Sequence, residues 1–345
     1  IINSKFHSSG GAGGLMGNAG ISNGDHNLNT LYGSGDNRLG INLIDCSYSK
    51  LDIYGEYAAG GFVGYICNNS QNNDKVKSSV LVKNMTENIV GADSKIVAGS
   101  RYSDSYAAGI FGYVKTRLEI NNITEQNVSI SSTGNKGAAG GLIGKQENAF
   151  NITSALYVGT EKKYATISIK QVDSNWNENV IIGGIVGDTA ISQDKTGTIQ
   201  KCGVKYVTLT EEKVSGKIGG IIGYVEKGKE CVVEQCKIEH FNANGNWTGG
   251  IVGSTNAVTT ITGCEVLGEN TTNQIDLQGV YSVGGILGFV QGKDLVKIEQ
   301  CKVDNAFIHA TTNSNTYAGG FIANMNKSDN KINLFDNTIQ NSSVQ

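Results

Sequence analysis

The pentapeptide GGLMG at residues 13–17 decides the fold, because variants of it return eight more times along the chain. The later copies are GGFVG at 60–64, AGIFG at 108–112, GGLIG at 140–144, GGIVG at 183–187, GGIIG at 219–223, GGIVG at 249–253, GGILG at 284–288 and GGFIA at 319–323. Successive copies lie 30 to 48 residues apart. A short motif that recurs at this spacing is typical of repeat proteins, in which each unit buries its apolar face against its neighbours.

A second strand in each repeat carries a marker residue three positions after an apolar one. The aligned marker residues are Cys46, Asn84, Asn121, Ala155, Cys202, Cys236, Cys264, Cys301 and Asn337. A third segment with alternating apolar residues follows in several repeats, as at residues 206–210 and 306–310. Three short strands joined by Gly and Asn turns predict one coil of a three-sided solenoid. We therefore expect an all-β, right-handed parallel β-helix of about nine coils, with residues 1–345 as one domain.

The rival repeat fold is a β-propeller, whose blades also carry glycine doublets at periods of 40 to 50 residues. A step of 30 residues leaves too little chain for the four strands and three turns of a blade. The solenoid is therefore the preferred interpretation.

Composition restricts the partners. The net charge of −3 gives no electrostatic footprint for nucleic acid. No apolar run approaches the roughly 18 residues of a membrane span, so we expect no membrane insertion. The chain begins at Ile1 without a leader pattern, and its ends carry no capping helix, which predicts a segment of a longer chain or of an end-to-end assembly.

The repeated Gly-Gly-apolar-apolar-Gly string resembles the GLUG repeat of bacterial secreted and cell-surface proteins. These include adhesins and the region before the protease domain of streptococcal IgA-peptidase-like proteins. The resemblance covers nearly the whole chain, although copy three has Ala108 and copy nine Ala323 in a glycine place. It implies a β-solenoid of an extracellular bacterial protein and brings no catalytic residue to any position.

The aligned cysteines have three interpretations: a packed and reduced column, disulfides, or a metal site. Neighbouring rungs are close enough for disulfides. However, the chain has seven cysteines, an odd number, and no paired spacing suited to zinc. We favour a buried structural ladder in which Asn residues bond the turn backbone, with Cys67 and Cys231 as the more exposed thiols.

Both apolar places of the pentapeptide are filled in all nine copies. In a flat strand one set would line the core and the other would form an outer apolar stripe for a partner or for self-association. Alternatively, the glycines permit a bend that turns both sets inward. We favour the bend, because an uncovered stripe of nine rungs would exceed the apolar patch that monomers usually expose.

Aromatic residues stand two or three positions ahead of several pentapeptides: Tyr57, Tyr106, Trp247, Tyr281 and Tyr317. They are candidate contacts for a sugar or a protein partner, or they cap the glycine surface of a neighbouring coil.

Enzyme signatures are absent from the sequence. The four histidines occupy unrelated repeat positions, HExxH and GxSxG do not occur, and the phosphate-loop imitation at residues 223–229 ends before Glu230 instead of Ser or Thr. The acidic residues share no repeat position. The sequence therefore predicts no catalytic residue, no metal and no cofactor.

These observations predict a non-catalytic, extracellular or cell-surface β-solenoid that serves as a stalk, adhesin or filament subunit. Its expected partner is a protein or glycan ligand, or another copy of itself. The alternative is a carbohydrate-active β-helix, a polysaccharide lyase or glycosidase, with loops at 86–105 and 159–180 supplying the chemistry. Ice binding is disfavoured, because no Thr-x-Thr ladder recurs at the repeat period.

Overall fold

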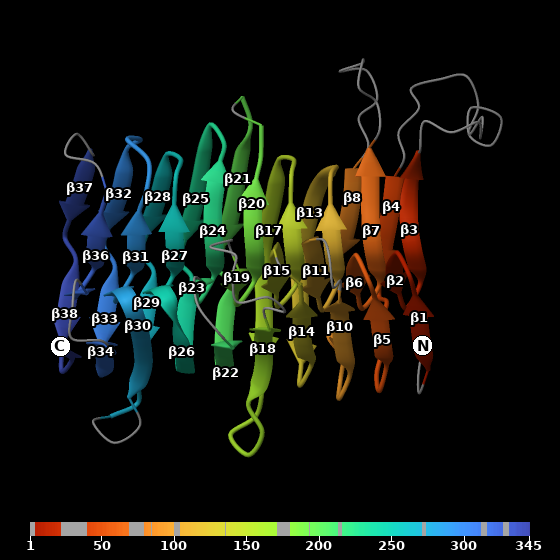
Figure 1. Cartoon of the computed structure of the whole chain (residues 1–345), viewed down its shortest axis with the longest axis horizontal. Coiled ribbons are helices and arrows are strands. Elements are labelled where there is room, and N and C mark those ends of the chain that lie inside the picture. The colour runs from red at the N-terminus through yellow and green to blue at the C-terminus, as the bar shows by residue number, and fades with distance from the viewer. Residues whose placement is uncertain are drawn as a thin grey trace.

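The chain is a parallel β-helix, as predicted. A computed structural model describes residues 4–21, 40–68, 79–83, 85–99, 104–134, 136–170, 180–192, 194–212, 216–270, 274–311, 316–326 and 331–345. All pairings between the named strands are parallel, and none of the described residues form a helix that could cross a membrane. Figure 1 shows the strands stacked along the long axis, with the two termini at opposite ends.

The complete turns contain five straight segments instead of three. The base strands are β1 (Lys5–Ser8), β5 (Asp52–Gly55), β10 (Lys95–Gly99), β14 (Ser129–Thr133), β18 (Ala165–Lys170), β34 (Ala306–Ala310) and β39 (Ser343–Val344). The approach strands, which lead into the pentapeptides, are β2 (Gly11–Gly13), β6 (Ala58–Gly60), β11 (Asp104–Ala108), β15 (Lys136–Gly140), β19 (Val180–Gly183), β23 (Gly216–Gly219) and β35 (Tyr317–Gly319).

The exit strands, which leave the pentapeptides, form a nine-stranded sheet with one strand from each repeat. They are β3 (Met16–Ile21), β7 (Val63–Asn68), β12 (Phe111–Val114), β16 (Ile143–Gln146), β20 (Val186–Ala190), β24 (Ile222–Lys227), β27 (Val252–Thr255), β31 (Leu287–Val290) and β36 (Ile322–Met325).

The marker strand of each turn is split in two. Its first segments are β4 (Gly40–Ile44), β8 (Ser79–Lys83), β21 (Thr196–Gln200), β25 (Glu230–Glu234), β28 (Thr259–Thr262), β32 (Val296–Glu299) and β37 (Ile332–Phe335), and its second segments are β9 (Met85–Val90), β29 (Glu265–Leu267), β33 (Lys302–Asp304) and β38 (Thr338–Gln340). Five longer strands cover two or more segments: β13 (Arg117–Gln126), β17 (Phe150–Val158), β22 (Gly203–Glu212), β26 (Lys237–Gly249) and β30 (Ile275–Gly284).

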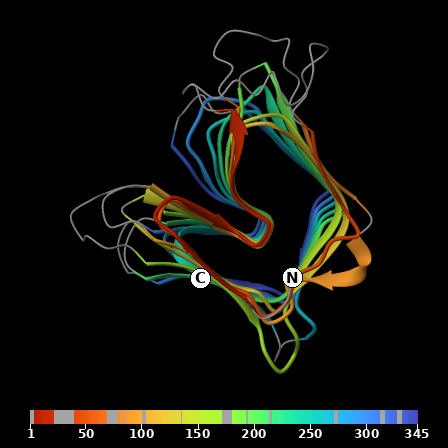
Figure 2. The same ribbon diagram turned by 90° about the vertical axis from the view of Figure 1, so that its right-hand side faces the viewer.

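The pentapeptides form an inward bend that indents one side of the cross-section, as Figure 2 shows. The bend requires glycine because it leaves no room for a side chain. Backbone conformation is not the reason, since no pentapeptide glycine has a left-handed φ. A Cβ added to Gly112 in the exit strand would lie 2.8 Å from the backbone nitrogen and oxygen of Ala59. A Cβ added to Gly220 would overlap the carbonyl oxygen of Gly250 in the next turn. The approach and exit strands therefore pack backbone against backbone at the bend.

The bend turns both apolar side chains of the pentapeptide into the core. In the seven interior copies these side chains are buried, from Phe62 and Val63 to Ile286 and Leu287. The outer stripe is therefore absent from the interior turns, and the bent alternative is correct. Only the terminal copies differ, where Leu15 is 45% exposed and Phe321 is half-buried.

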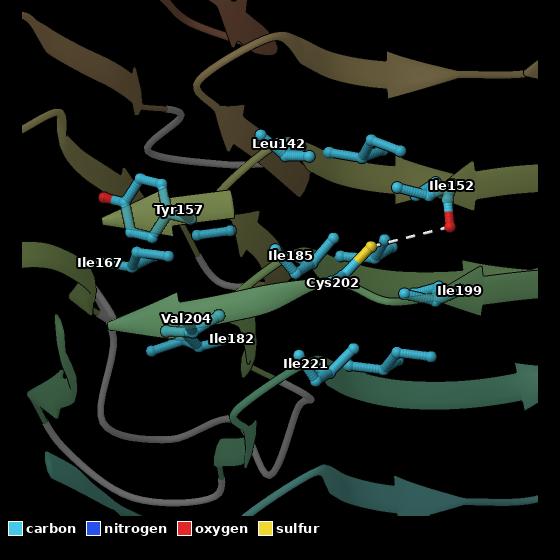
Figure 3. Close-up of a cluster of buried hydrophobic side chains, with 14 of the residues drawn as sticks. Leu142, Ile152, Tyr157, Ile167, Ile182, Ile185, Ile199, Cys202, Val204 and Ile221 are labelled. Carbon is cyan, nitrogen blue, oxygen red and sulfur yellow. Dashed lines mark hydrogen bonds between the residues drawn. The ribbon is translucent and has the colours of Figure 1, made fainter. Parts of the chain in front are cut away.

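One apolar core runs along the inside of the coil from Ala12 to Ile308. Figure 3 shows part of it, with Ile152, Ile199 and Cys202 from neighbouring turns lying side by side. Two segments that the sequence suggested as loops hold regular strands of the coil. Residues 86–105 contain β10, and residues 159–180 contain β18, while 100–103 and 171–179 lie outside the described residues.

A left-handed residue separates the two segments of the marker strand in nearly every described turn. The residues are Asp45, Asn122, Ser154, Lys201, Gln235, Gly263, Gln300 and Asp336, with φ between 51° and 61°. The sharp corner therefore has one backbone conformation but varied side chains. Asn and Asp tolerate it well, whereas Lys and Gln adopt it at a cost.

Gly263→Ala is expected to lower the free energy of unfolding by about 1 kcal/mol. The added methyl has room, because the nearest heavy atom is Cγ of Gln235 at 3.6 Å, so the cost comes from φ alone. Gln300→Gly at the next turn is the reciprocal control and should be neutral or stabilising. Urea unfolding followed by circular dichroism measures both, and equal destabilisation by the two variants would contradict this account.

Candidate functional site

The marker residues form a column at the corner that follows each left-handed residue. Parallel pairing aligns Cys202, Cys236, Cys264 and Cys301 in successive turns and continues to Asn337. Ala155 precedes Cys202 in the same column.

The sequence alignment of the column was wrong by two residues at Asn121. The structure pairs Asn121 with Thr153, and Ile123 with Ala155, so Ile123 holds the marker place and Asn121 is exposed. The next turn toward the N-terminus contributes Met85, which pairs with Ile123. Asn84 lies outside the described residues.

Cysteine and asparagine perform the same task in this column. The Cys301 thiol donates to the carbonyl of Glu299 in its own turn at 3.4 Å and approaches that of Ile261 in the preceding turn at 3.6 Å. Asn337 Nδ2 donates to the carbonyl of Ile298 at 2.7 Å, and its Oδ1 accepts from the Cys301 backbone N–H at 2.9 Å. Figure 3 shows the equivalent contact from Cys202 to Ile152. The column therefore satisfies carbonyls at the corner.

The six cysteines whose side chains are described are free thiols, and Cys67 lies outside that set. Cys46 is half-buried. Cys231, which the sequence suggested as exposed, is fully buried on strand β25, because it alternates inward with Val233. Burial, with a smaller contribution from Glu230, raises the pKa of the Cys231 thiol to about 12.

We expect one fast-reacting thiol in a Cys67→Ser variant treated with Ellman's reagent at pH 8. Cys46 should react, whereas Cys202, Cys231, Cys236, Cys264 and Cys301 should react only after unfolding, because these five side chains are buried and the reagent cannot reach them. Absorbance at 412 nm before and after guanidinium counts the thiols. Rapid reaction of a second thiol in the native protein would contradict the packed column.

The structure brings the predicted aromatic residues together in two pairs, not in one track. Tyr57 and Tyr106 have ring centroids 5.5 Å apart, and Trp247 and Tyr281 have centroids 5.6 Å apart. Tyr106 and Trp247 share one position of the approach strands, which holds Ala138, Ile181 and Lys217 in the turns between them. Tyr57 and Tyr281 stand one residue before that position, which Ala58 and Ser282 hold in their turns. Tyr317 continues the position of Tyr106 and Trp247 in the last turn, where it is half exposed.

These aromatic residues belong to a larger group, which we call the wedge, between the approach and exit strands on the outer side of the bend. The wedge contains Tyr57, Tyr65, Tyr106, Tyr113, Lys115, Lys145, Glu147, Asp188, Lys217, Tyr224, Glu226, Trp247, Tyr281, Phe289 and Gln291. It forms a cluster separate from the main core.

Four tyrosines form the aromatic part of the wedge near the N-terminal end. Tyr106 and Tyr113 have ring centroids 4.7 Å apart, and the Tyr65 ring lies 5.2 Å from that of Tyr113. The ammonium of Lys115 sits 5.1 Å above the Tyr113 ring and 3.8 Å from the Glu147 carboxylate. Tyr57, Tyr65 and Lys115 are half-buried, so this part of the wedge reaches the surface.

The centre of the wedge is charged. Lys145 Nζ lies 3.0 Å from the Asp188 carboxylate, 3.7 Å from that of Glu226 and 3.9 Å from that of Glu147. Burial raises the pKa of Asp188 to about 6, against the opposing effect of Lys145. Burial also disfavours the charge on Lys145, but Asp188 outweighs it and raises the pKa of the ammonium. The wedge thus holds a partly desolvated ion network in contact with aromatic rings.

A second lysine in the wedge is almost completely enclosed. Lys217 is 1% exposed, and its Nζ lies 3.4 Å above the centre of the Tyr224 ring. Burial lowers the pKa of Lys217 to about 8, although Asp188 acts in the opposite direction. Its side chain also contacts Gln291, whose carbonyl accepts a hydrogen bond from the Tyr224 hydroxyl.

Sequence reasoning missed most of the wedge, namely Lys217 and the ten residues that lie in or directly after the exit strands. All ten exit-side residues occupy one of two places, directly after the pentapeptide or two positions later: Tyr65, Tyr113, Lys115, Lys145, Glu147, Asp188, Tyr224, Glu226, Phe289 and Gln291. Because they vary between aromatic and charged, no conserved residue type marks them. The signal was positional, and a residue-by-residue alignment on the pentapeptides would have shown it.

The described residues include no group of three or more His, Cys, Asp or Glu placed to hold a metal ion. No family model, curated protein or solved structure matches this chain.

Proposed function

We propose that this chain is a non-catalytic β-solenoid that works at the outer surface of a bacterium as a stalk, adhesin or filament segment. The observation that carries the proposal is the uninterrupted pairing of turns, which makes a stiff rod whose ladder of strands runs from β1 to β39. Such an architecture displays a long surface at a distance from its anchor. The resemblance of the pentapeptides to the GLUG repeat supports the extracellular location.

The wedge supports an adhesive role for the rod. It presents half-exposed rings at both ends of a charged centre, and aromatic faces with nearby polar groups are the usual means of binding sugars and protein side chains. Tyr281, 42% exposed beside Trp247, is the most accessible ring of the wedge. We propose a glycan or protein ligand that lies along this seam.

Binding to a glycan array and to bacterial or host surface extracts tests the adhesive role. A Trp247→Ala/Tyr281→Ala variant should bind at least about tenfold more weakly, which corresponds to 1.4 kcal/mol. Tyr164→Ala is the matched control, since Tyr164 is a half-buried aromatic residue outside the wedge. Equal affinity of the wedge variant and wild type, or isolated compact globules instead of rods in electron micrographs, would refute the proposal.

A carbohydrate-active enzyme is the second candidate, and one observation favours it. The structure gathers Asp188 and Glu226 around Lys145, although the sequence showed no shared position for acidic residues. A buried carboxyl with a raised pKa beside a lysine is a common arrangement for general acid or base catalysis. Turnover in a panel of polysaccharides, abolished by Asp188→Asn, would establish this candidate and replace the non-catalytic role.

A further inference from the structure

A buried lysine and a half-buried carboxamide meet in the wedge across two turns of the coil. Lys217 Nζ, on approach strand β23, lies 3.5 Å from Oε1 of Gln291, which follows exit strand β31. The Tyr224 hydroxyl donates a hydrogen bond of 2.8 Å to the same oxygen. The amine therefore stands beside a carbonyl group that is already polarised by a hydrogen-bond donor.

The surroundings keep water away and favour the uncharged amine. Lys217 is 1% exposed, Tyr224 7% and Asp188 3%. With a pKa of about 8, roughly a tenth of the Lys217 side chains carry no proton at pH 7 and are nucleophilic. An enclosed lysine of this kind destabilises a fold when it serves only for packing, which suggests that it has a chemical role.

We propose that Lys217 and Gln291 join spontaneously in an intramolecular isopeptide bond. The lone pair of Lys217 Nζ attacks Cδ of Gln291, and the negative charge that develops on Oε1 is stabilised by the Tyr224 hydroxyl. A proton passes from Nζ to Nε2, the Cδ–Nε2 bond breaks, and ammonia leaves. One C–N bond forms and one C–N bond breaks, so the reaction needs no oxidant, reductant or external enzyme.

We assign the proton transfer to Asp188. Of the nearby carboxylates it has the largest effect on the pKa of Lys217. Its Oδ1 is buried with no hydrogen-bond partner among the described residues, so one oxygen is available to accept and return a proton. Oδ2 is held by Lys145. A carboxyl with a pKa near 6 can take a proton from the attacking amine and return it to the leaving nitrogen.

The bond would act as a longitudinal staple. It would connect β23 with the turn of β31 and pass over β27, where Ser254 contributes only a small side chain between Tyr224 and Phe289. The two linked residues are 74 positions apart in sequence. The staple would therefore prevent this part of the coil from unwinding under tension. This property suits a stalk, but the proposed bond does not depend on the stalk role.

Intact-protein mass spectrometry of the purified full chain tests the proposal. The wild-type mass should be lower than the sequence mass by one ammonia, and a tryptic digest should contain one branched peptide that joins Lys217 to Gln291. Trypsin should fail to cleave after Lys217. Lys217→Met and Gln291→Ala should each restore the full sequence mass, with circular dichroism showing that the variants remain folded.

The chain offers a matched control pair. Lys195 Nζ lies 3.1 Å from Oδ1 of Asn148, closer than the proposed pair, but both residues are half-buried. Lys195→Met should leave the mass deficit unchanged, and no peptide should join Lys195 to Asn148. Asp188→Asn should slow formation of the bond at least tenfold, whereas Glu226→Gln, which removes the other nearby wedge carboxylate, should leave the rate within about twofold.

The proposal is overturned if wild-type protein has its full sequence mass and yields separate linear peptides for Lys217 and Gln291. It is equally overturned if the missing ammonia maps to another residue, such as a cyclised Asn. Force spectroscopy gives an independent readout, because the closed loop should shorten the extended chain by about 250 Å relative to Lys217→Met. Equal extended lengths of the two proteins would also refute the bond.

Discussion

Replacing Gly220 with valine should lower the free energy of unfolding by about 3 kcal/mol or more. Gly220 is the second glycine of an interior pentapeptide, and an added side chain would overlap the carbonyl oxygen of Gly250 and press on Cδ1 of Ile238 at 3.0 Å. The obstacle on one side is the backbone of the next turn, which cannot rotate away as a side chain could. The turns would have to separate, and the parallel ladder would weaken locally.

Thermal and urea unfolding of Gly220→Val, followed by circular dichroism, measure this effect. Gly10→Val provides the control, since the nearest heavy atom to an added Cβ at Gly10 is Oγ of Ser8 at 4.0 Å. That variant should remain within about 0.5 kcal/mol of wild type. Comparable losses of unfolding free energy in the two variants would mean that lack of room at the bend is not the reason for its glycines.

The second large effect is a loss of stability as the pH rises, caused by a single buried glutamate. Glu125 is completely buried inside the coil, beneath Gly109, where the following turns carry Tyr157 and Val204. The Tyr48 hydroxyl lies 2.6 Å from both the Glu125 carboxyl and the Gly109 carbonyl oxygen. One phenolic proton cannot serve both oxygens, so a protonated carboxyl completes the pair of hydrogen bonds.

Burial raises the pKa of Glu125 well above its ordinary value of 4.5, and the Tyr48 hydrogen bond only partly opposes this effect. The unfolded chain releases the proton near pH 4.5, whereas the folded chain keeps it to a higher pH. Between these two values the folded state binds one more proton, so stability falls as pH rises, by up to about 1.4 kcal/mol per pH unit. The stabilising contribution is complete only below the unfolded pKa.

Glu125→Gln should remove this pH dependence, because the amide keeps the shape of the side chain without an ionisable proton. Urea unfolding from pH 4 to 9 should therefore give a steeper decline for wild type than for the variant. Glu119→Gln, on the exposed partner of an Arg117 ion pair, controls for general charge effects and should follow wild type. Parallel curves for wild type and Glu125→Gln would contradict the burial of a neutral carboxyl.

The sequence predicted the parallel coil, the role of the pentapeptides and most of the cysteine column. These features repeat, so each copy reinforces the others, and the bend follows from two adjacent apolar residues that both need burial. The right-handed winding remains a prediction. The error at Asn121 arose because Leu118 and Ile120 both fit the apolar place before the marker, and only the left-handed Asn122 fixes the correct register.

The wedge could be predicted only in part, for a physical reason. The approach aromatic residues stood out because they recur two or three positions ahead of the pentapeptides, but their partners lie across the bend, on strands that begin after the glycines. Whether those partners face the core or the outside depends on the direction of the bend, which period-two alternation does not define. Contacts such as Lys217 with Gln291 also skip a turn, and no local pattern records such a separation.

The strict pairing of each turn with the next has a consequence for how such a gene can change over generations. A duplication or deletion of one complete repeat would join matching strand edges, place a pentapeptide above a pentapeptide and leave the ladder unbroken. The length of the molecule could then change in steps of about 4.8 Å, the distance between neighbouring strands, without a new fold being required. Recombination between repeats would thus adjust how far this protein extends.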